Sequence, residues 1–503
     1  MISNYLLGVD LGTTATKAAL YTVDGVCVSE GRSDVPLHHP QPGAVEQDPE
    51  DFYLSAAAAV RGCLAACSAD PAQVCGLAFD SQMAGVGTID ADFRPATRFD
   101  SWLDMRCRPY IEQLDRDHGD LITETTGCPP TCDHGPKILW WMHERPHDYC
   151  RVAKFVMPTC YVAGRAAGIR ADEAYIDYTF LHFTALSEAR EGRWSERLCG
   201  LLGVDRDRLP RVVAPWDVIG ELRPGAAHDF GLKAGIPVAA GCGDTAAGAL
   251  GAGLVRPGLV LDTAGTAAVL ACSTGRFVAD RAHRALLTMR SVVPGVWNPL
   301  AYIAGGGLAL RWFREIFTPG ERGYDAFFDL AKQAPPGCDG LLFSPHLGGR
   351  ICPTAPEMRG AWTGFSWSHG RAHFARAILE AVAYEYGSYV QILGGLLPEL
   401  ELTEARVIGG GARSDFWNGI KAAVLGTPYR RVLRQESATW GAALIAGKAA
   451  GVIDGLAAHA EEHAALSADA IPPDPGAQPA YRRASEQYRA WQEHLRNGFR
   501  HHG

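Results

Sequence analysis

Residues 5–20, YLLGVDLGTTATKAAL, join two apolar runs through a turn of glycine and threonine. This pattern predicts a β-hairpin whose turn holds Gly12, Thr13 and Thr14. Backbone N–H groups in such a turn, with threonine hydroxyls beside them, suit phosphate oxygens. Asp10 ends the first predicted strand, where its carboxylate could hold a hydrated Mg²⁺. Taken alone, the stretch fits an ordinary hairpin equally well.

A second stretch, residues 258–270 with the sequence GLVLDTAGTAAVL, repeats this pattern of strand, small-residue turn and strand. Its turn carries Gly265 and Thr266. Two such hairpins, separated by roughly 250 residues, predict two related lobes that face one ligand.

Length and composition limit the classes of protein that the chain can belong to. The 503 residues suggest two to four domains, and 47% hydrophobic residues suffice for large cores. The net charge of −9 and the lack of a basic block argue against nucleic-acid binding. We find no signal peptide and no apolar run long enough to span a membrane. The 14 cysteines follow no repeating pattern, so we expect free thiols and a cytoplasmic protein.

Asp244 is the candidate for acid–base chemistry. It follows a predicted strand, residues 236–240, in the sequence GCGDTAAGA. A carboxylate at a strand end, with glycines that let a substrate approach, could act as general base toward an alcohol. The alternative is that Asp244 only caps the next helix.

Two polar loops are candidates for sugar contacts. The strand predicted at residues 74–79 ends in DSQMAG, which contains Gln82, Met83 and Ala84, and strand ends of open α/β sheets commonly bind ligands. In SWLDMR, Trp102 offers an aromatic face and Asp104 a carboxylate for hydroxyls. The alternative for this second loop is a surface salt bridge beside a packed tryptophan.

The C-terminal half contains a candidate nucleotide motif. A strand at residues 406–408 leads into the glycine turn 409–411 and a helix that begins near Asp415. This geometry suits a nucleotide phosphate or ribose, although the motif is neither that of a Rossmann fold nor that of a P-loop. The Ala/Gly-rich helix predicted at residues 436–451 could lie against an adenine or against the sheet, and we favour the sheet.

These motifs, in their order, resemble those of the FGGY family of carbohydrate kinases, closest to its xylulokinase-like members. The resemblance covers nearly the whole chain. Its motifs are GVDLGTTATKAALY, VEQDPEDFY, SQMAG, GCGDTAAGALGAG, DTAGTAAV, GGRICPTAPEMRGAWTGF, IGGGARSDFW and ESATWGAALIA.

The resemblance implies an α/β fold of two actin-like (ribonuclease H-like) lobes with a ligand cleft between them, divided as residues 1–254 and 255–503. It also implies transfer of the γ-phosphoryl group of MgATP to a sugar or polyol hydroxyl, with Asp244 as base and Asp10 near Mg²⁺. The expected substrate-binding residues are Gln82, Met83, Ala84, Trp102, Asp104 and Asp244. The expected ATP-binding residues are Gly12, Thr13, Thr14, Lys17, Gly265, Thr266, Gly305, Gly410, Gly411, Ala412 and Ser414.

The chain departs from the xylulokinase pattern at positions expected to contact substrate. Ala84 stands where a histidine is usual, Leu103 and Met105 replace the Asn and Gly of WNDGR, and Thr245 replaces an asparagine. Ala267 and Ala268 stand where serine and glycine are usual in the second hairpin. Kinase activity is therefore better supported than xylulose as substrate, because a lost polar contact changes selectivity among hydroxyls.

Two alternatives to a kinase are an ATP-binding member of the actin superfamily without sugar kinase activity, and a sugar-responsive regulator. The acidic balance disfavours the regulator. We expect a small sugar or polyol as the partner, without nucleic acid or membrane, and a homodimer is one assembly that we consider.

Overall fold

The computed structural model describes residues 4–318 and 323–500 and divides into two compact units of mixed α/β structure. Unit 1 comprises residues 1–255, 288–297 and 436–464, and unit 2 comprises residues 256–287, 298–435 and 465–503. The predicted division after residue 254 lies close to the first point at which the chain passes from unit 1 to unit 2, after Val255. It misassigns residues 436–464, which return to unit 1 and pack against its sheet.

Unit 1 is built on a sheet with the strand order β13-β14-β5-β1-β2-β3, in which β15 also pairs with β5. The predicted first hairpin is confirmed, because β1 and β2 pair antiparallel from Tyr5↔Thr22 to Leu11↔Thr16. β5 runs parallel to β1 on the other side. The strands are β1 (Tyr5–Leu11), β2 (Ala15–Thr22), β3 (Cys27–Asp34), β5 (Val74–Ser81), β13 (Val218–Glu221), β14 (Pro237–Ala239) and β15 (Cys242–Gly243).

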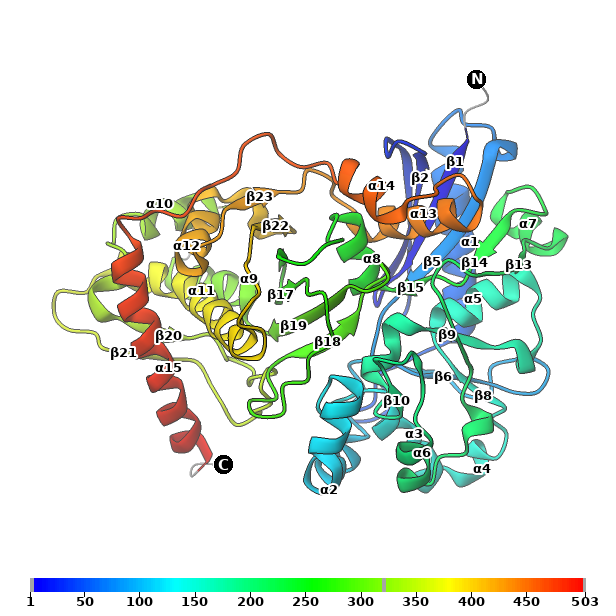
Figure 1. Ribbon diagram of the computed structural model, residues 1–503, viewed down its shortest axis with the longest axis horizontal. Helices are drawn as coiled ribbons and strands as arrows, with labels where there is room; N and C mark the ends of the chain where they lie inside the picture. The colour runs from blue at the N-terminus through cyan, green and yellow to red at the C-terminus, as the bar shows by residue number, and fades with distance from the viewer. Residues whose placement is uncertain (1–3, 319–322, 501–503) are drawn as a thin grey trace. The chain divides into compact units, whose positions relative to one another are not determined.

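Two helices far apart in the sequence pack on this sheet. α1 (Pro49–Ala65) begins with the Asp48 side chain accepting the N–H of Glu50 at 2.9 Å and with proline in the first turn. α13 (Ser437–Ala449) contacts β1, β5 and α8 (Asp244–Gly251), and Figure 1 shows this orange helix beside the blue strands. The Ala/Gly-rich helix therefore lies against the sheet, as we favoured.

The rest of unit 1 consists of further elements, most of them between β5 and β13. The helices are α2 (Arg108–Thr126), α3 (His134–Glu144), α4 (Pro146–Tyr149), α5 (Pro158–Ala167), α6 (Glu196–Leu202), α7 (Pro224–Phe230) and α14 (Leu456–Glu462). The strands are β4 (Glu46–Gln47), β6 (Gly87–Ile89), β7 (Phe99–Asp100), β8 (Lys154–Val156), β9 (Tyr175–Asp177), β10 (Ser187–Glu188), β11 (Arg193–Trp194) and β12 (Arg211–Val213). β18 (Leu287–Arg290) falls where the residue ranges of the two units meet.

Unit 2 repeats the central strand order of unit 1. Its sheet contains β19-β17-β16-β22-β23, in which β16 and β17 form the predicted second hairpin and β22 runs parallel to β16. The strands are β16 (Leu259–Ala264), β17 (Ala268–Cys272), β19 (Trp297–Ile303), β22 (Glu404–Ile408) and β23 (Tyr429–Arg431), with the separate pair β20 (Leu342–Ser344) and β21 (Ala361–Thr363). The internal repeat inferred from the two turns thus extends to whole sheets.

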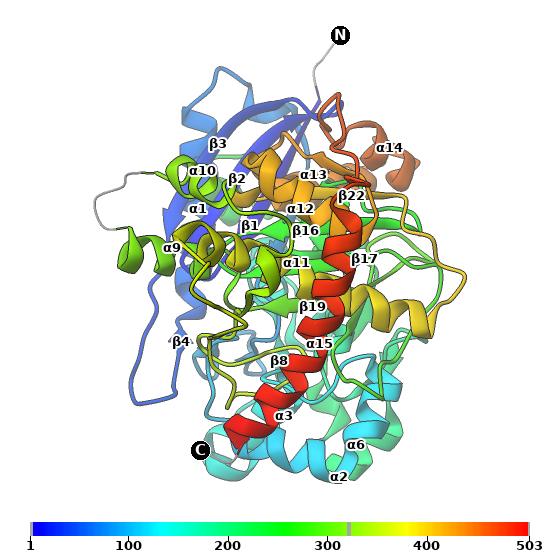
Figure 2. The ribbon, with the colours of Figure 1, turned by 90° about the vertical axis from the view of Figure 1, so that its left-hand side faces the viewer.

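The helices of unit 2 cover this sheet. They are α9 (Gly306–Phe317), α10 (Asp325–Ala331), α11 (Arg371–Leu396), α12 (Asp415–Leu425) and α15 (Gln478–Arg500). The long α11 packs against α12, α10 and the C-terminal α15, and Figure 2 shows α15 as the red helix that ends the chain. Within the described ranges, no helix combines the length and the apolar character that a membrane span requires.

Candidate active site

Three aspartates gather where neighbouring strands of unit 1 end. Asp10 of β1 is the register partner of Asp80 of β5, and Cys242 of β15 is the register partner of Asp80 on the other side. Asp244 follows β15 directly as the first residue of α8. The parallel pairing brings the carboxyl ends of these strands to one edge, which is the usual location of ligand sites in open α/β sheets.

The three carboxyl groups have unusual acidities. Asp80 is fully buried, and no N–H or O–H donor in the described part of the chain reaches either of its carboxylate oxygens. Burial, with Asp10 and Asp244 nearby, raises the pKa of Asp80 well above its usual range. Burial raises the pKa of Asp10 to about 6, although Lys17 opposes the shift. Both shifts favour the uncharged form of these carboxyl groups.

Asp244 is held by its neighbour in the sequence. Its Oδ1 accepts the backbone N–H of Thr245 at 2.6 Å and the hydroxyl of Thr245 at 3.1 Å. Burial, with Asp10 as the second cause, raises the pKa of Asp244 to about 7. The N-cap of α8 is Gly243, so Asp244 is not the capping residue that the alternative interpretation assumed. A carboxyl group with a pKa near neutrality suits a general base.

The first glycine turn is tied to the neighbouring loops. Thr13 accepts the indole N–H of Trp102 on its Oγ1 at 2.9 Å, and its carbonyl accepts the side-chain amide of Gln47 at 2.9 Å. Thr14 is exposed. A Cβ at Gly12 would lie 2.7 Å from the carbonyl oxygen of Ala15, so the turn needs glycine there.

Lys17, expected near ATP, lies on β2 opposite Asp10 and forms an ion pair with Glu436 at 2.7 Å. About a third of each side chain in this pair is exposed. Its positive charge lowers the pKa of Asp10, so Lys17 acts on the carboxylate cluster from the neighbouring strand.

The loop after β5 brings its residues to the same edge. Gln82 is buried, and its amide donates to Oε1 of Gln47 at 2.7 Å. Met83 packs so closely on Gly243 that a Cβ there would lie 2.6 Å from Cε of Met83. Ala84 has a φ of +56°, a backbone conformation that non-glycine residues seldom adopt. Gln82 and Met83 thus lie next to the strand end that carries Asp244.

The second expected sugar loop divides into an exposed and a buried part. Trp102 is 44% exposed and offers an aromatic face. Asp104 is buried, and its Oδ2 accepts the Nε–H of Arg106 at 2.9 Å and the backbone N–H of Val45 at 2.8 Å. Arg106 also contacts Asp100 at 2.7 Å. The salt bridge of the alternative interpretation exists, but it is buried and joins Asp104 to the loop instead of lying on the surface.

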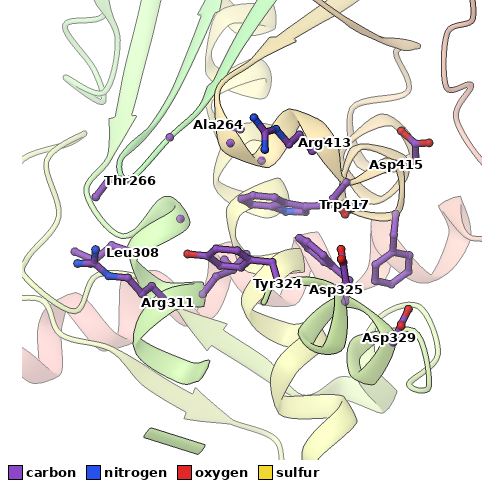
Figure 3. A pocket seen from close by; sticks show the side chains of 18 of the residues that line it. Ala264, Thr266, Leu308, Arg311, Tyr324, Asp325, Asp329, Arg413, Asp415 and Trp417 are labelled. Carbon is purple, nitrogen blue, oxygen red and sulfur yellow. Dashed lines mark hydrogen bonds between the residues drawn. The ribbon is translucent and has the colours of Figure 1, made fainter. Parts of the chain in front are cut away.

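Unit 2 contains a cavity of about 1140 Å³ between its second hairpin, α10 and the glycine turn. Figure 3 shows Thr266 on one side of the cavity and Arg413 and Trp417 on another. Asp325, the first residue of α10, and Tyr324, the residue before it, also line the cavity. Among the expected ATP-binding residues, the lining includes Gly265, Thr266, Gly410, Gly411 and Ser414. The cavity therefore gathers residues of two motifs that are about 145 residues apart in the sequence.

Gly305 and Ala412, also expected to bind ATP, are absent from the described lining of this cavity. A Cβ at Gly305 would lie 2.1 Å from the carbonyl oxygen of Pro345, so this glycine permits close packing at the start of α9. Ala412 is buried, and its carbonyl accepts the side-chain amide of Asn418 at 2.9 Å. Ala412 lies in the chain between the lining residues Gly411 and Arg413.

Sequence reasoning missed two residues of the site, Asp80 and Gln47. Asp80 was read only as part of a polar loop, although it ends a strand that must pair with a neighbour. Its place opposite Asp10 depends on the β1–β5 register, which no local pattern reveals. Gln47 bridges Thr13 and Gln82, and only the glutamine in EQDPE marked it in the sequence.

Comparison with known proteins agrees with this arrangement. The family models described as the N-terminal and C-terminal domains of the FGGY family of carbohydrate kinases match residues 5–251 and 262–450. The chain belongs to the FGGY family. The resemblance inferred from the motifs is thereby confirmed, as is the two-domain, actin-like fold class.

Relatives within the family have different substrates in their names. The chain is 27% identical to a xylulose kinase of Bacillus subtilis, covering 91% of each chain, and 27% identical to a gluconokinase of the same species, covering 90% and 89%. A crystal structure of a xylulose kinase (printed as xyloylose kinase) from Brucella ovis matches with a TM-score of 0.90 and 26% identity over 98% of this chain and 99% of that one. The chain is a carbohydrate kinase similar to xylulose kinases.

Proposed function

We propose that this FGGY kinase transfers the γ-phosphoryl group of ATP to a hydroxyl of a ketopentose such as xylulose, or of a related ketose or polyol. The observation that carries the proposal is the state of Asp244. Its pKa of about 7 poises it between accepting and releasing a proton at neutral pH. Thr245 holds Oδ1 through both hydrogen bonds, which orients Oδ2 for a substrate hydroxyl.

The cavity of unit 2 is the proposed site for ATP. A Cβ at Gly410 would meet no described atom within 4 Å, so the backbone is open to a ligand there. The lining holds three cationic side chains, Arg311, Lys332 and Arg413, and three carboxylates, Asp325, Asp329 and Asp415. Apolar walls and a few convergent polar groups are typical of small-molecule sites. We assign Gly265, Thr266, Gly410, Gly411 and Ser414 to the nucleotide.

Mg²⁺ fits the acidic edge of unit 1. The described residues hold no group of three or more His, Cys, Asp or Glu side chains that could bind a metal by themselves. Mg²⁺ in phosphoryl-transfer sites keeps several waters and needs only one or two carboxylates with the phosphates. Asp10, with the buried and donor-free Asp80 behind it, supplies such a set. When bound, the ion would neutralise phosphate charge.

Phosphoryl transfer requires little of the protein beyond the positioning of the two substrates. The sugar oxygen bonds to the γ-phosphorus as the bond from that phosphorus to the β,γ-bridging oxygen breaks, and ADP leaves. The sugar hydroxyl proton passes to Oδ2 of Asp244. On the sugar side, Gln82, Met83, Ala84 and the exposed face of Trp102 would line the substrate. The γ-phosphoryl group of ATP must come within bonding distance of the sugar hydroxyl for transfer to occur.

A panel of phosphoryl acceptors tests the proposal. Coupled ADP release should show turnover with at least one pentulose, hexulose or polyol, and replacement of Asp244 by asparagine should abolish most of it. Gluconate belongs in the panel as second candidate, because the gluconokinase relative is as similar as the xylulose kinase. ATP binding without turnover on any acceptor would favour a non-catalytic member of the superfamily. Turnover that survives in the Asp244 variant would overturn the role of the base.

A further inference from the structure

The segment formed by β9 and the short helix η3 (Tyr178–Phe183) lies against the chain that leads to Asp244. Two of its side chains hold that chain in place. The hydroxyl of Tyr175 donates to the carbonyl of Ala240 at 3.0 Å, and Oγ1 of Thr179 accepts the N–H of Gly243 at 3.0 Å. The second contact is made to the residue immediately before Asp244.

The hydroxyl of Thr179 has a fixed direction. Its proton is donated to Oδ1 of Asp177 at 2.6 Å, and the backbone N–H of Thr179 reaches the same oxygen at 2.9 Å. Because that proton is engaged by Asp177, a lone pair of Oγ1 is left to face Gly243. The side chains of Thr179 and Asp177 are buried, so water does not compete for these bonds.

Gly243 has no side chain that could cap the start of α8. It is the N-cap of α8, a position where a Ser, Thr, Asp or Asn side chain usually satisfies the helix end. Met83 occupies the place of its missing side chain, since a Cβ would lie within 2.8 Å of Cε, Sδ and Cγ of Met83. The backbone here is therefore held from outside the helix, by Thr179.

We propose that Thr179 and Asp177 are positioning residues for Asp244, an inference that rests on the proposed role of Asp244 as base. Asp177 orients the Thr179 hydroxyl, and Thr179 fixes the peptide from which Asp244 projects. Small displacements of a catalytic group are costly, and one of about 1 Å can reduce the rate 100-fold. Neither residue touches the substrate in this scheme, so the affinity for ATP should not depend on them.

The decisive variant is Thr179→Val, which keeps the shape of the side chain and removes its hydroxyl. We expect kcat for the best acceptor to fall about 10- to 100-fold, with an unchanged dissociation constant for an ATP analogue. Thr179→Ser restores the hydroxyl and should recover kcat to within about threefold of the wild type. If Thr179→Val does not fold, Thr179→Ala makes the same test without a methyl group in place of the hydroxyl.

Thr184→Val is the matched control. Thr184 is a buried threonine just after η3, and its hydroxyl donates to Leu181 at 2.8 Å without contacting Gly243. Loss of the Thr184 hydroxyl should lower the midpoint of thermal unfolding about as much as loss of the Thr179 hydroxyl does. It should leave kcat within about twofold of the wild-type value. Equal kcat losses in the Thr179 and Thr184 variants, or an unchanged kcat in Thr179→Val, would overturn the positioning role.

Failure of the proposed function gives a different result. In that case the wild type shows no turnover on the panel, or Asp244→Asn keeps its activity. If the positioning role alone is wrong, the wild type still turns over an acceptor and Asp244→Asn does not.

Discussion

Unit 1 and unit 2 build their sheets with the same central strand order, yet their buried carboxylates meet different partners. In unit 1, Asp80 lies beside two other aspartates, and no donor in the described chain reaches its oxygens. In unit 2, Glu385 accepts hydrogen bonds from four side chains: His346, Arg350, Tyr389 and Tyr488. Burial alone would raise the pKa of Glu385, but Arg350 and His346 lower it to about 2.

The difference separates a reactive site from a structural one. A buried carboxylate with several donors stays charged and fixes the elements that supply them. Glu385 in this way joins α11 to α15 and to the loop after β20. Buried carboxylates that lack donors keep a high pKa and favour a proton or a cation instead. Unit 1 therefore holds groups that can exchange protons near neutral pH, whereas unit 2 uses its buried acid for stability.

The largest effect is expected for Asp244→Asn. The amide keeps the shape of the side chain but cannot accept the proton, so kcat should fall by about 10²- to 10⁴-fold. Coupled ADP release with the best acceptor measures it, and the thermal midpoint should stay near that of the wild type. A decrease in kcat of less than tenfold would show that Asp244 is not the base. It would also weaken the contrast between the units.

Glu385→Gln should act on stability instead of chemistry. Arg350 would lose its buried counter-charge, and the free energy of unfolding should fall by about 3–5 kcal/mol. Urea denaturation measures the change. The control is Glu112→Gln, whose ion pair with Arg108 is exposed and should contribute no more than about 1 kcal/mol. Similar losses in the two variants would show that Glu385 is not a structural centre.

The pH dependence of activity should follow Asp244. Because its pKa is raised to about 7, the ionised base is lost as pH falls below that value, and kcat/KM for the sugar should fall about tenfold per unit. Initial rates from pH 5.5 to 8.5 at saturating ATP test this. A flat profile between pH 5.5 and 7 would mean that the base ionises well below neutrality.

Thr245→Val should shift that profile modestly. The Thr245 hydroxyl stabilises the ionised form of Asp244, so its removal raises the pKa of the base. The acidic limb should move upward by less than about one unit, and activity at pH 7 should fall a few-fold. Thr245→Ser keeps the hydroxyl and should retain the wild-type profile. A downward shift in the valine variant would contradict the geometry.

Asp80→Asn should have the smallest effect on stability. Burial and the neighbouring Asp10 and Asp244 favour the neutral form of Asp80, so an uncharged asparagine of similar shape should be tolerated there. The free energy of unfolding at pH 7 should change by less than about 1 kcal/mol. A loss comparable to that in Glu385→Gln would show that Asp80 is ionised and paired, and would make the two units alike.

Local patterns were sufficient for the elements that carry the site. Both hairpins and the strand before Asp244 were predicted because turn chemistry and apolar patterning depend on near neighbours in the chain. The ordered motifs were sufficient for the family. Gly305 shows a limit of such patterns, because a glycine that binds phosphate and one that permits close packing look the same in a sequence.

Residue types at short spacing were sufficient for the hairpins, the family and the candidate base. Contacts between distant segments show that residues 436–464 return to the first sheet and that Asp80 stands opposite Asp10. The tertiary structure also shows that Asp104 is engaged by Arg106 and that Thr179 holds the peptide before Asp244. The pairing of Asp80 with Asp10 depends on strand register, where a shift of one residue would turn each side chain to the other face. The other outcomes depend on how the segments pack and which side chains become buried, and neither is set by residue types at short spacing.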